Sequence, residues 1–333
     1  MLYVTTRSDT DVFTAQKVLR ETRGPDGGFY VPFRMSGFSE EELESMSRTT
    51  FYQRVAEILN RLVQNRLTAW DVEFAIGRRA VQLKPLGSRI LMAECWHNPD
   101  GCYSRLERNV GTLLTGTDNP PGSWVRIAIG VAVLGGIALE LRKQGLPQMD
   151  ISLASGDFAL PVSTWFAREW GFPIGNIVLC SLEQKNLWDL LCHGQMRTDT
   201  QGTSPRQIPV PPELELLLWA CGGKDETERF VTACRRGSLY TLSEPTLGKL
   251  RRGLFASVVS TGRVEETIPA VYRTHHYLLS RGTALAYAGL LDCRARTGST
   301  GQAMVIAEKS PALEADSTAP LLGMTERELI EQV

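Results

Sequence analysis

Lysine is scarce in this chain of 333 residues, although basic residues as a class are not. Lysine and arginine together number 36, and the lysines among them are Lys17, Lys84, Lys143, Lys185, Lys224, Lys249 and Lys309. A Schiff base with an aldehyde needs the amine of a lysine, so few positions could carry that chemistry. The stretch between Lys84 and Lys143 contains none.

Cysteine pairs at metal-binding spacing are also absent. The seven cysteines are odd in number and none forms a CxxC pair, which argues against a zinc site and against a disulfide framework. We expect buried free thiols in a reducing compartment. The neighbours His275 and His276 are predicted to lie on a strand, where adjacent side chains point to opposite faces and do not share a metal. We therefore expect no metal site.

The chain lacks an excess of charge of either sign, because 36 basic residues nearly cancel 37 acidic ones. Without a basic stripe, no nucleic-acid partner is expected. The N-terminus lacks the basic segment and apolar run of a signal peptide. The longest apolar run, Ile127 to Leu139, lies between Arg126 and Glu140 and is too short to span a bilayer. We expect a buried helix there, no membrane association and a cytoplasmic location.

Helix and strand patterns divide the chain into two parts. Residues 1–90 are predicted to form a compact α+β domain, with strands at 2–6 and 29–33 and helices at 10–21, 50–62 and 70–80. A tight turn is expected at Gly27 and Gly28, where Asp-Gly-Gly favours one. Residues 91–333 are predicted to form a larger α/β domain. Its size fits the large core that a chain of this length can bury.

Strands and helices alternate in this second part. Strands are predicted at 90–93, 150–154, 177–181 and 302–307, and helices at 124–144, 160–170, 186–192, 212–219, 224–236, 244–257, 283–294 and 322–333. Residues 198–212 are rich in Pro, Ser and Gln, and we expect an exposed loop there. Such alternation is typical of βαβ units around a parallel sheet.

Three stretches, in order along the chain, carry a family likeness. They are Tyr3-Val-Thr-Thr-Arg7 with Pro25-Asp-Gly-Gly-Phe-Tyr-Val-Pro32; Ile151-Ser-Leu-Ala-Ser-Gly-Asp-Phe-Ala159 with Gly171-Phe-Pro-Ile-Gly175; and Ser280-Arg-Gly-Thr-Ala284 with the segment from Met304 to Pro311. Together they resemble threonine synthase, a pyridoxal-phosphate (PLP) enzyme of fold type II, like the β subunit of tryptophan synthase. The resemblance covers nearly the whole chain and implies an α/β fold, a lyase family and a place in amino-acid biosynthesis.

The segment that holds the cofactor lysine in that family is altered here. Its best match is Glu94-Cys-Trp-His-Asn-Pro-Asp-Gly-Cys-Tyr-Ser-Arg105, in which Ser104 stands where the resemblance implies the lysine. Serine cannot form a Schiff base, so the covalent anchor and the proton shuttle would both be lost. His97, in register with a family histidine, is a candidate base, but a packed histidine is the simpler interpretation.

The family's next block, a mobile small domain that binds the substrate carboxylate, has no counterpart. The chain passes from Val110 through a predicted loop, Gly111 to Gly122, directly to the helix at Trp124. Water exclusion and substrate orientation would both fail without that domain. We therefore expect a truncated fold with the small domain largely missing.

The phosphate loop also departs from the family. The resemblance implies vestigial cofactor contacts at Ser155, Gly156, Asp157, Phe158, Ala159 and Glu308. Asp157 replaces a neutral Asn, and its carboxylate would repel a phosphate that the loop and helix N-terminus otherwise attract. An alternative is that Asp157 caps the following helix. Glu308 stands where the family has a threonine facing the pyridine nitrogen.

These departures favour a non-catalytic relative of threonine synthase with a binding or regulatory role. We expect no catalytic residue and no bound cofactor, and the partner would be an unidentified protein or a small-molecule ligand. The alternative is a PLP-dependent threonine synthase or related lyase that acts on O-phosphohomoserine or a similar amino acid, with Lys84 or Lys309 supplying the amine. A hydrolase built on Ser104 and His97 lacks both a G-x-S-x-G elbow and a placed acid. A sensor that uses the pocket without covalent chemistry is a third class.

Overall fold

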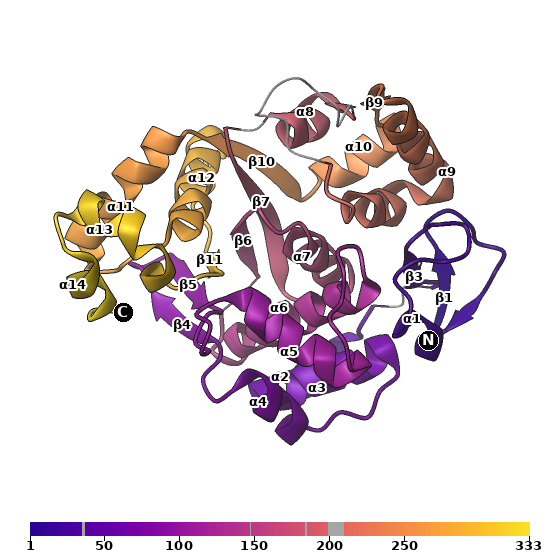
Figure 1. Ribbon diagram of the computed structural model, residues 1–333, viewed down its shortest axis with the longest axis horizontal. Helices are drawn as coiled ribbons and strands as arrows, with labels where there is room; N and C mark the ends of the chain where they lie inside the picture. The colour runs from indigo at the N-terminus through magenta and orange to yellow at the C-terminus, as the bar shows by residue number, and fades with distance from the viewer. Residues whose placement is uncertain (35–36, 147, 184, 199–209) are drawn as a thin grey trace.

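A mixed six-stranded sheet forms the centre of the molecule, in the order β10-β7-β6-β11-β5-β4 (Figure 1). The computed structural model describes residues 1–34, 37–146, 148–183, 185–198 and 210–333. The strands of the sheet are β4 (Gln82–Pro85), β5 (Ile90–Glu94), β6 (Met149–Ala154), β7 (Ile174–Leu182), β10 (Leu254–Val259) and β11 (Ala303–Ala307). Neighbouring strands are parallel except for β4 with β5. The expected α/β class is confirmed, with a mostly parallel sheet in place of a wholly parallel one.

Helices and two small sheets surround this centre. The helices before β6 are α1 (Ala15–Val18), α2 (Glu40–Ser47), α3 (Phe51–Val63), α4 (Ala69–Ile76), α5 (Tyr103–Thr115) and α6 (Trp124–Lys143). Those after it are α7 (Ala159–Glu169), α8 (Asn186–His193), α9 (Leu214–Arg236), α10 (Glu244–Arg251), α11 (Thr261–His275), α12 (Arg281–Thr297), the 3-10 turn η1 (Pro311–Glu314), α13 (Ala315–Leu322) and α14 (Glu326–Ile330). The small sheets join β1 (Leu2–Thr5) to β2 (Phe13–Thr14) and β3 (Tyr30–Pro32), and β8 (Gln195–Arg197) to β9 (Leu239–Thr241).

Both faces of the central sheet are buried, because parallel strands with helical crossovers are covered on each side. Ile177 and Leu179 of β7 belong to the apolar cluster that includes α6 and α7. The alternate residues, Val178 and Cys180, belong to a second cluster that includes α11 and α12. In Figure 1, α12 and α7 accordingly flank the sheet from opposite sides. The two-residue period of the strand thus divides the core into two layers.

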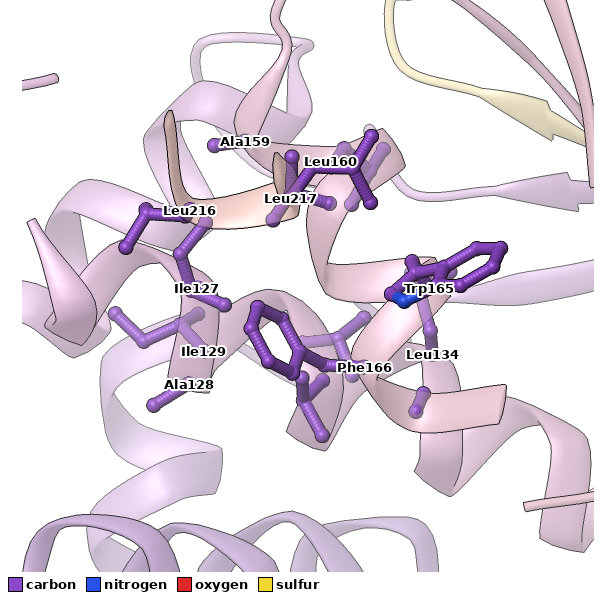
Figure 2. Packing of buried hydrophobic residues seen from close by; sticks show 14 of the residues in the cluster. Ile127, Ala128, Ile129, Leu134, Ala159, Leu160, Trp165, Phe166, Leu216 and Leu217 are labelled. Carbon is purple, nitrogen blue, oxygen red and sulfur yellow. The ribbon is translucent and has the colours of Figure 1, made fainter. Parts of the chain in front are cut away.

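Helix α6 is the central helix of the core. Among the described residues it alone is long and apolar enough to cross a membrane, but its residues are almost all buried in protein. Figure 2 shows Ile127 and Leu134 of α6 clustered with Leu160 and Phe166 of α7 and with Leu216 of α9. The apolar run is therefore the buried helix that the sequence predicts.

The tight turn predicted at Gly27 and Gly28 is present. The Gly24 N–H donates to the Gly28 carbonyl at 2.8 Å, and Arg23 pairs with Phe29 just outside the turn. Gly27 has a φ of +78°, a conformation that costs glycine little and other residues more. The turn leads directly into β3, which pairs with β1.

The N-terminal sheet packs on the larger part of the molecule. Tyr3 of β1 lies edge-on to Trp124 of α6, with ring centroids 6.3 Å apart, and its hydroxyl donates to the carbonyl of Leu62. At the other side, the Thr6 hydroxyl donates to Glu215 of α9 at 2.5 Å. Figure 1 shows this sheet beside α9. The proposed domain boundary at residue 90 stays a prediction.

The helix predicted over residues 244–257 is wrong in its second half. Helix α10 ends at Arg251, and residues 254–259 form β10, the edge strand beside β7. A short apolar run does not distinguish strand from helix by periodicity, and the valines at its end favour a strand. Gly253 separates the two elements, where a Cβ atom would lie 2.4 Å from the Arg168 guanidinium carbon.

Two further predictions are corrected. The loop expected over Gly111–Gly122 begins only at Gly116, because α5 continues to Thr115. His275 and His276 do not lie on a strand: His275 ends α11, and His276 caps it with a left-handed φ of 51°. The buried residues Val264, Ile268 and Val271 recur with a helical period, which is the pattern of a helix and not of a strand.

Helix lengths differ from prediction elsewhere. The helix expected over residues 10–21 covers only α1, and the helix expected over 322–333 is interrupted after Gly323. The two helices expected within 212–236 join into α9 with a kink at Gly223. The loop expected over 198–212 lies mostly outside the described residues.

A buried arginine ties three N-terminal and core helices together. Arg54 of α3 is fully buried and donates to Glu140 of α6 at 2.6 Å. Its guanidinium also donates to the carbonyls of Met46, Thr49 and Gly136, at distances of 3.0, 2.5 and 3.0 Å. A buried guanidinium stabilises the folded state only while each of its N–H donors keeps an acceptor.

We predict that Arg54→Leu lowers the free energy of unfolding by about 3–5 kcal/mol, because several buried carbonyls and Glu140 lose their donor. Urea unfolding of the purified protein measures this loss. Arg48→Leu is the control, because the Arg48 side chain is 76% exposed, and its effect should stay within about 0.5 kcal/mol. Equal losses in the two variants would contradict the prediction.

Candidate functional site

A cavity of about 370 Å³ lies at the carboxyl ends of β6 and β11. Ala154, the last residue of β6, and Glu308, which follows β11, form part of its wall. The first turn of α5 contributes Ser104, and the first turn of α12 contributes Gly282 and Thr283. In open α/β sheets, ligands bind outside the carboxyl ends of the strands. This cavity is therefore the candidate functional site.

The cavity brings together four of the residues that the sequence singles out: Ser104, Gly156, Asp157 and Glu308. The other three residues of the predicted phosphate loop, Ser155, Phe158 and Ala159, do not line it. Phe158 and Ala159 are buried in the core beneath the loop. The Ser155 amide donates to the Cys180 carbonyl of the neighbouring strand at 2.8 Å. The predicted loop thus presents only part of its length to the cavity.

Asp157 has two structural partners. Its Oδ1 accepts a hydrogen bond from the Ala159 amide at 3.0 Å, which caps the start of α7 as the capping interpretation predicts,. Its Oδ2 lies 2.5 Å from Nη2 of Arg126. The carboxylate is therefore held at the floor of the cavity by the helix on one side and a cation on the other.

Arg126, in the first turn of α6, connects three carboxylates. It pairs with Glu107 of α5, with Asp157, and at 3.5 Å with Glu213 beside α9. Burial lowers the pKa of the guanidinium, but the hydrogen bonds and charge of Glu107, together with the charges of Asp157 and Glu213, outweigh it, so the net shift is upward. Burial raises the pKa of Glu107, while its bonds to Arg126 oppose that shift. Four charges that are costly to bury singly are thereby stabilised as a group.

Glu308 differs from these carboxylates, because no described residue donates a hydrogen bond to its side chain. Its backbone carbonyl accepts from the Tyr103 amide at 2.7 Å, which joins the end of β11 to the start of α5. Burial, with the negative charge of Asp157 as a smaller contribution, raises the pKa of the Glu308 carboxyl to about 8. Its carboxyl group is therefore poised to change charge near neutral pH.

The two lysines that could supply an amine lie in different places. Lys309 lines the cavity, with a side chain 57% exposed and its Nζ 3.9 Å from Glu314. Lys84 lines a separate cavity of about 190 Å³, together with Glu94 and His97. Of the two, Lys309 alone can reach a ligand held near Ser104.

His97 does not join Ser104. Its Nε2 lies 2.7 Å from Glu94, which also accepts from the Tyr277 hydroxyl at 2.7 Å, and its ring stacks on Trp96. Ser104 instead contacts the Cys102 thiol at 3.1 Å. The hydrolase arrangement is absent, and the packed-histidine interpretation agrees with this geometry. Among the described residues, no three His, Cys, Asp or Glu side chains are grouped to hold a metal.

Residues 2–79 match the family described as threonine synthase N terminus. The whole fold is similar to solved threonine synthases. The PLP-bound enzyme from Brucella melitensis has 18% identity and a TM-score of 0.84, covering 97% of this chain and 92% of its own. The yeast enzyme has 14% identity and a TM-score of 0.80, covering 99% and 93%.

The chain has the fold of the threonine synthases. The Escherichia coli threonine synthase, at 14% identity and a TM-score of 0.73, covers 100% of this chain and 94% of its own. No curated protein matches the sequence. The structural likeness establishes the fold, PLP fold type II, and the N-terminal match agrees with the resemblance seen in the sequence.

Sequence reasoning on this threonine synthase-like protein missed the ion cluster of Arg126. A charged residue in the first turn of an otherwise apolar helix was a signal for it, because such a charge needs a buried partner. The partners Glu107 and Glu213 are far from Arg126 in the sequence, and no local pattern identifies them.

We predict that Arg126→Met lowers the free energy of unfolding by about 3–5 kcal/mol near neutral pH, because three carboxylates lose their cation. The loss should shrink as the pH falls toward 5. Without the cation, the folded state binds protons on these groups more readily than the unfolded state, so acid favours the folded variant.

Urea unfolding at two pH values tests this. Arg142→Met is the matched control from the same helix. Arg142 pairs with Glu40 and Glu44, which are 72% and 46% exposed, so its loss should be below about 1 kcal/mol. A deficit in Arg126→Met that does not depend on pH would rule out carboxylate repulsion as its cause.

Proposed function

We propose that this threonine synthase-like protein is not a lyase and acts through binding. The observation that carries the proposal is that Ser104 lines the same cavity as Asp157 and Glu308, which both carry carboxyl groups. By the sequence register, Ser104 replaces the amine that anchors the cofactor. The cavity keeps its location at the strand ends while its chemistry differs from that of a PLP site.

The residues of the cavity do not fit PLP. A phosphate dianion needs amide donors and positive charge, whereas Asp157 places a carboxylate beside Gly156. The guanidinium that contacts Asp157, that of Arg126, is already shared among three carboxylates. A pyridinium nitrogen opposite Glu308 would lack the family's hydroxyl. We therefore derive no reaction step through this cofactor.

A short connection between α5 and α6 further supports the proposal. Residues 116–123 join the two helices, and we propose that they replace the small domain that closes over substrate in the family. An enzyme of this kind needs closure to exclude water and hold the substrate. With Ser104 exposed, reactants would remain in contact with solvent.

The role we propose is binding or regulation in the cytoplasm, with a small molecule in the cavity or a protein as partner. The rival proposal is a PLP-dependent threonine synthase or related lyase that acts on O-phosphohomoserine or a similar amino acid. One observation favours the rival: Lys309 lines the cavity. Its pairing with Glu314 and its exposure make it a poor internal base.

We predict no aldimine and no turnover. The protein with excess PLP should show no absorbance band that borohydride fixes onto a lysine, and no threonine should form from O-phosphohomoserine. Lys309→Arg is the matched variant, because it keeps the charge and removes the reactive amine. A reduced adduct on Lys309, lost in Lys309→Arg together with turnover, would establish the rival proposal.

We also predict that Ser104→Lys restores less than about 1% of the activity of an active threonine synthase, even if the new lysine attaches PLP. The reason is that the effects of catalytic groups that act as a unit are strongly non-additive. The carboxylates of Asp157 and Glu308 would still face the cofactor. Steady-state assay with excess PLP measures this. Full activity in Ser104→Lys would mean that the rest of the catalytic apparatus is intact.

A further inference from the structure

We propose that the cavity binds a small molecule carrying a protonated amine, with the Glu308 carboxylate receiving the ammonium group. This inference rests on the proposed function, because it requires that PLP does not occupy the same space. The volume of about 370 Å³ falls in the range of small-molecule sites.

The first support is the state of the Glu308 side chain. It lies at the wall of the cavity, and no described residue donates a hydrogen bond to it, although it is withdrawn from most of the solvent. A carboxylate in such a position is costly unless a donor or cation joins it. An ammonium group supplies both a positive charge and three N–H donors.

The second support is the charge of the surrounding wall. Asp157 and Glu314 add carboxylates to the cavity, and Glu107 is joined to Asp157 through Arg126. Arg126 is shared among its acidic partners, so it offers little charge to a ligand. Lys309 is mostly exposed and near Glu314. The field inside the cavity therefore favours a cation and opposes a phosphate.

The third support is the hydroxyl groups that share the cavity wall with Glu308. Ser104, Ser280 and Thr283 line the same cavity, and a hydroxyl can accept from an ammonium while donating elsewhere. Ser280 and Thr283 are fixed by a mutual hydrogen bond of 2.8 Å. A charged N–H group can thus be held by one carboxylate and neighbouring hydroxyls, which is a strong arrangement.

Titration of Glu308 gives the proposal a distinctive signature. The titratable groups that act on its carboxyl are Asp157, Glu107 and Lys309, together with the Cys95 thiol, whose pKa burial raises so that it stays neutral. Because the pKa of Glu308 is about 8, most molecules carry a proton there at neutral pH. Binding an ammonium displaces that proton. Amine affinity should therefore increase roughly tenfold for each unit by which the pH is raised toward 8.

Calorimetric titration of the intact protein tests this with 1,4-diaminobutane and 2-aminoethanol as amines, and with ethane-1,2-diol, inorganic phosphate and PLP as controls. We expect binding of the amines alone, with proton release near neutral pH seen as a dependence of the heat on the buffer. L-serine tests whether the bound amine can be the amino group of an amino acid. If its carboxylate contacts Lys309, Lys309→Met should weaken L-serine and leave the amines unchanged.

The decisive variants are Glu308→Gln and Glu308→Asp, with Glu44→Gln as a surface control. Glu308→Gln resembles the protonated residue in shape, and urea unfolding checks that it is folded. We expect Glu308→Gln to weaken amine binding at least about tenfold at pH 8 and to abolish proton release, while Glu308→Asp keeps part of both. Glu44→Gln should leave both unchanged.

Three results overturn the inference: no amine binding by the folded protein at about 10 mM ligand, equal binding by wild type and Glu308→Gln, or preference for phosphate over amine. These results are distinct from failure of the proposed function. That failure would appear as a borohydride-fixed PLP adduct with turnover, whereas absent amine binding without an adduct leaves the non-catalytic role standing.

Discussion

The ion cluster around Arg126 is the interaction on which the arrangement of the cavity depends. A cation in the first turn of a helix opposes the helix dipole, so α6 can begin with Arg126 only because acidic groups surround it. Those groups come from α5, from the loop after β6 and from the residue before α9. Glu213 also accepts from the Gly122 amide at 2.8 Å, which fixes the chain entering α6. One guanidinium therefore holds together the elements that carry Ser104, Asp157 and the floor of the cavity.

The same cluster orders the loop that follows β6. Asp157 caps α7 and pairs with Arg126, so the loop is ordered by protein contacts and needs no bound phosphate to hold it. The strand ends at Ala154 and Ala307 remain where a fold of this class places a ligand,. Glu308, which follows β11, lines that space, and no residue in the described part of the chain donates a hydrogen bond to its side chain. The fold thus sets the position of the cavity, and the residues that line it decide what it can bind, since function resides in the site and not in the fold.

Sequence patterns predicted most elements whose residues interact locally. The turn at Gly27, the helical cap at Asp157 and the buried helix α6 each depend on residues close together in the chain, and all three are present. Strand β10 was missed because its apolar residues pack equally well in a helix until a neighbouring strand offers hydrogen bonds. His275 was misjudged for a related reason, because the helix that precedes it is stabilised by packing on α12.

The sequence by itself determined that Ser104 stands in the segment resembling the cofactor-lysine motif, because residue identity needs no structure. It also predicted the alternation of strands and helices after residue 90, which follows from local periodicity, whereas the division into two domains stays a prediction. Only the tertiary structure decided that Lys309 lines the cavity while Lys84 does not, and that His97 pairs with Glu94 away from Ser104. The tertiary structure also decided that Glu107 and Glu213 form ion pairs with Arg126. These relations join residues far apart in the chain, and their energies depend on burial and distance, which no local pattern encodes.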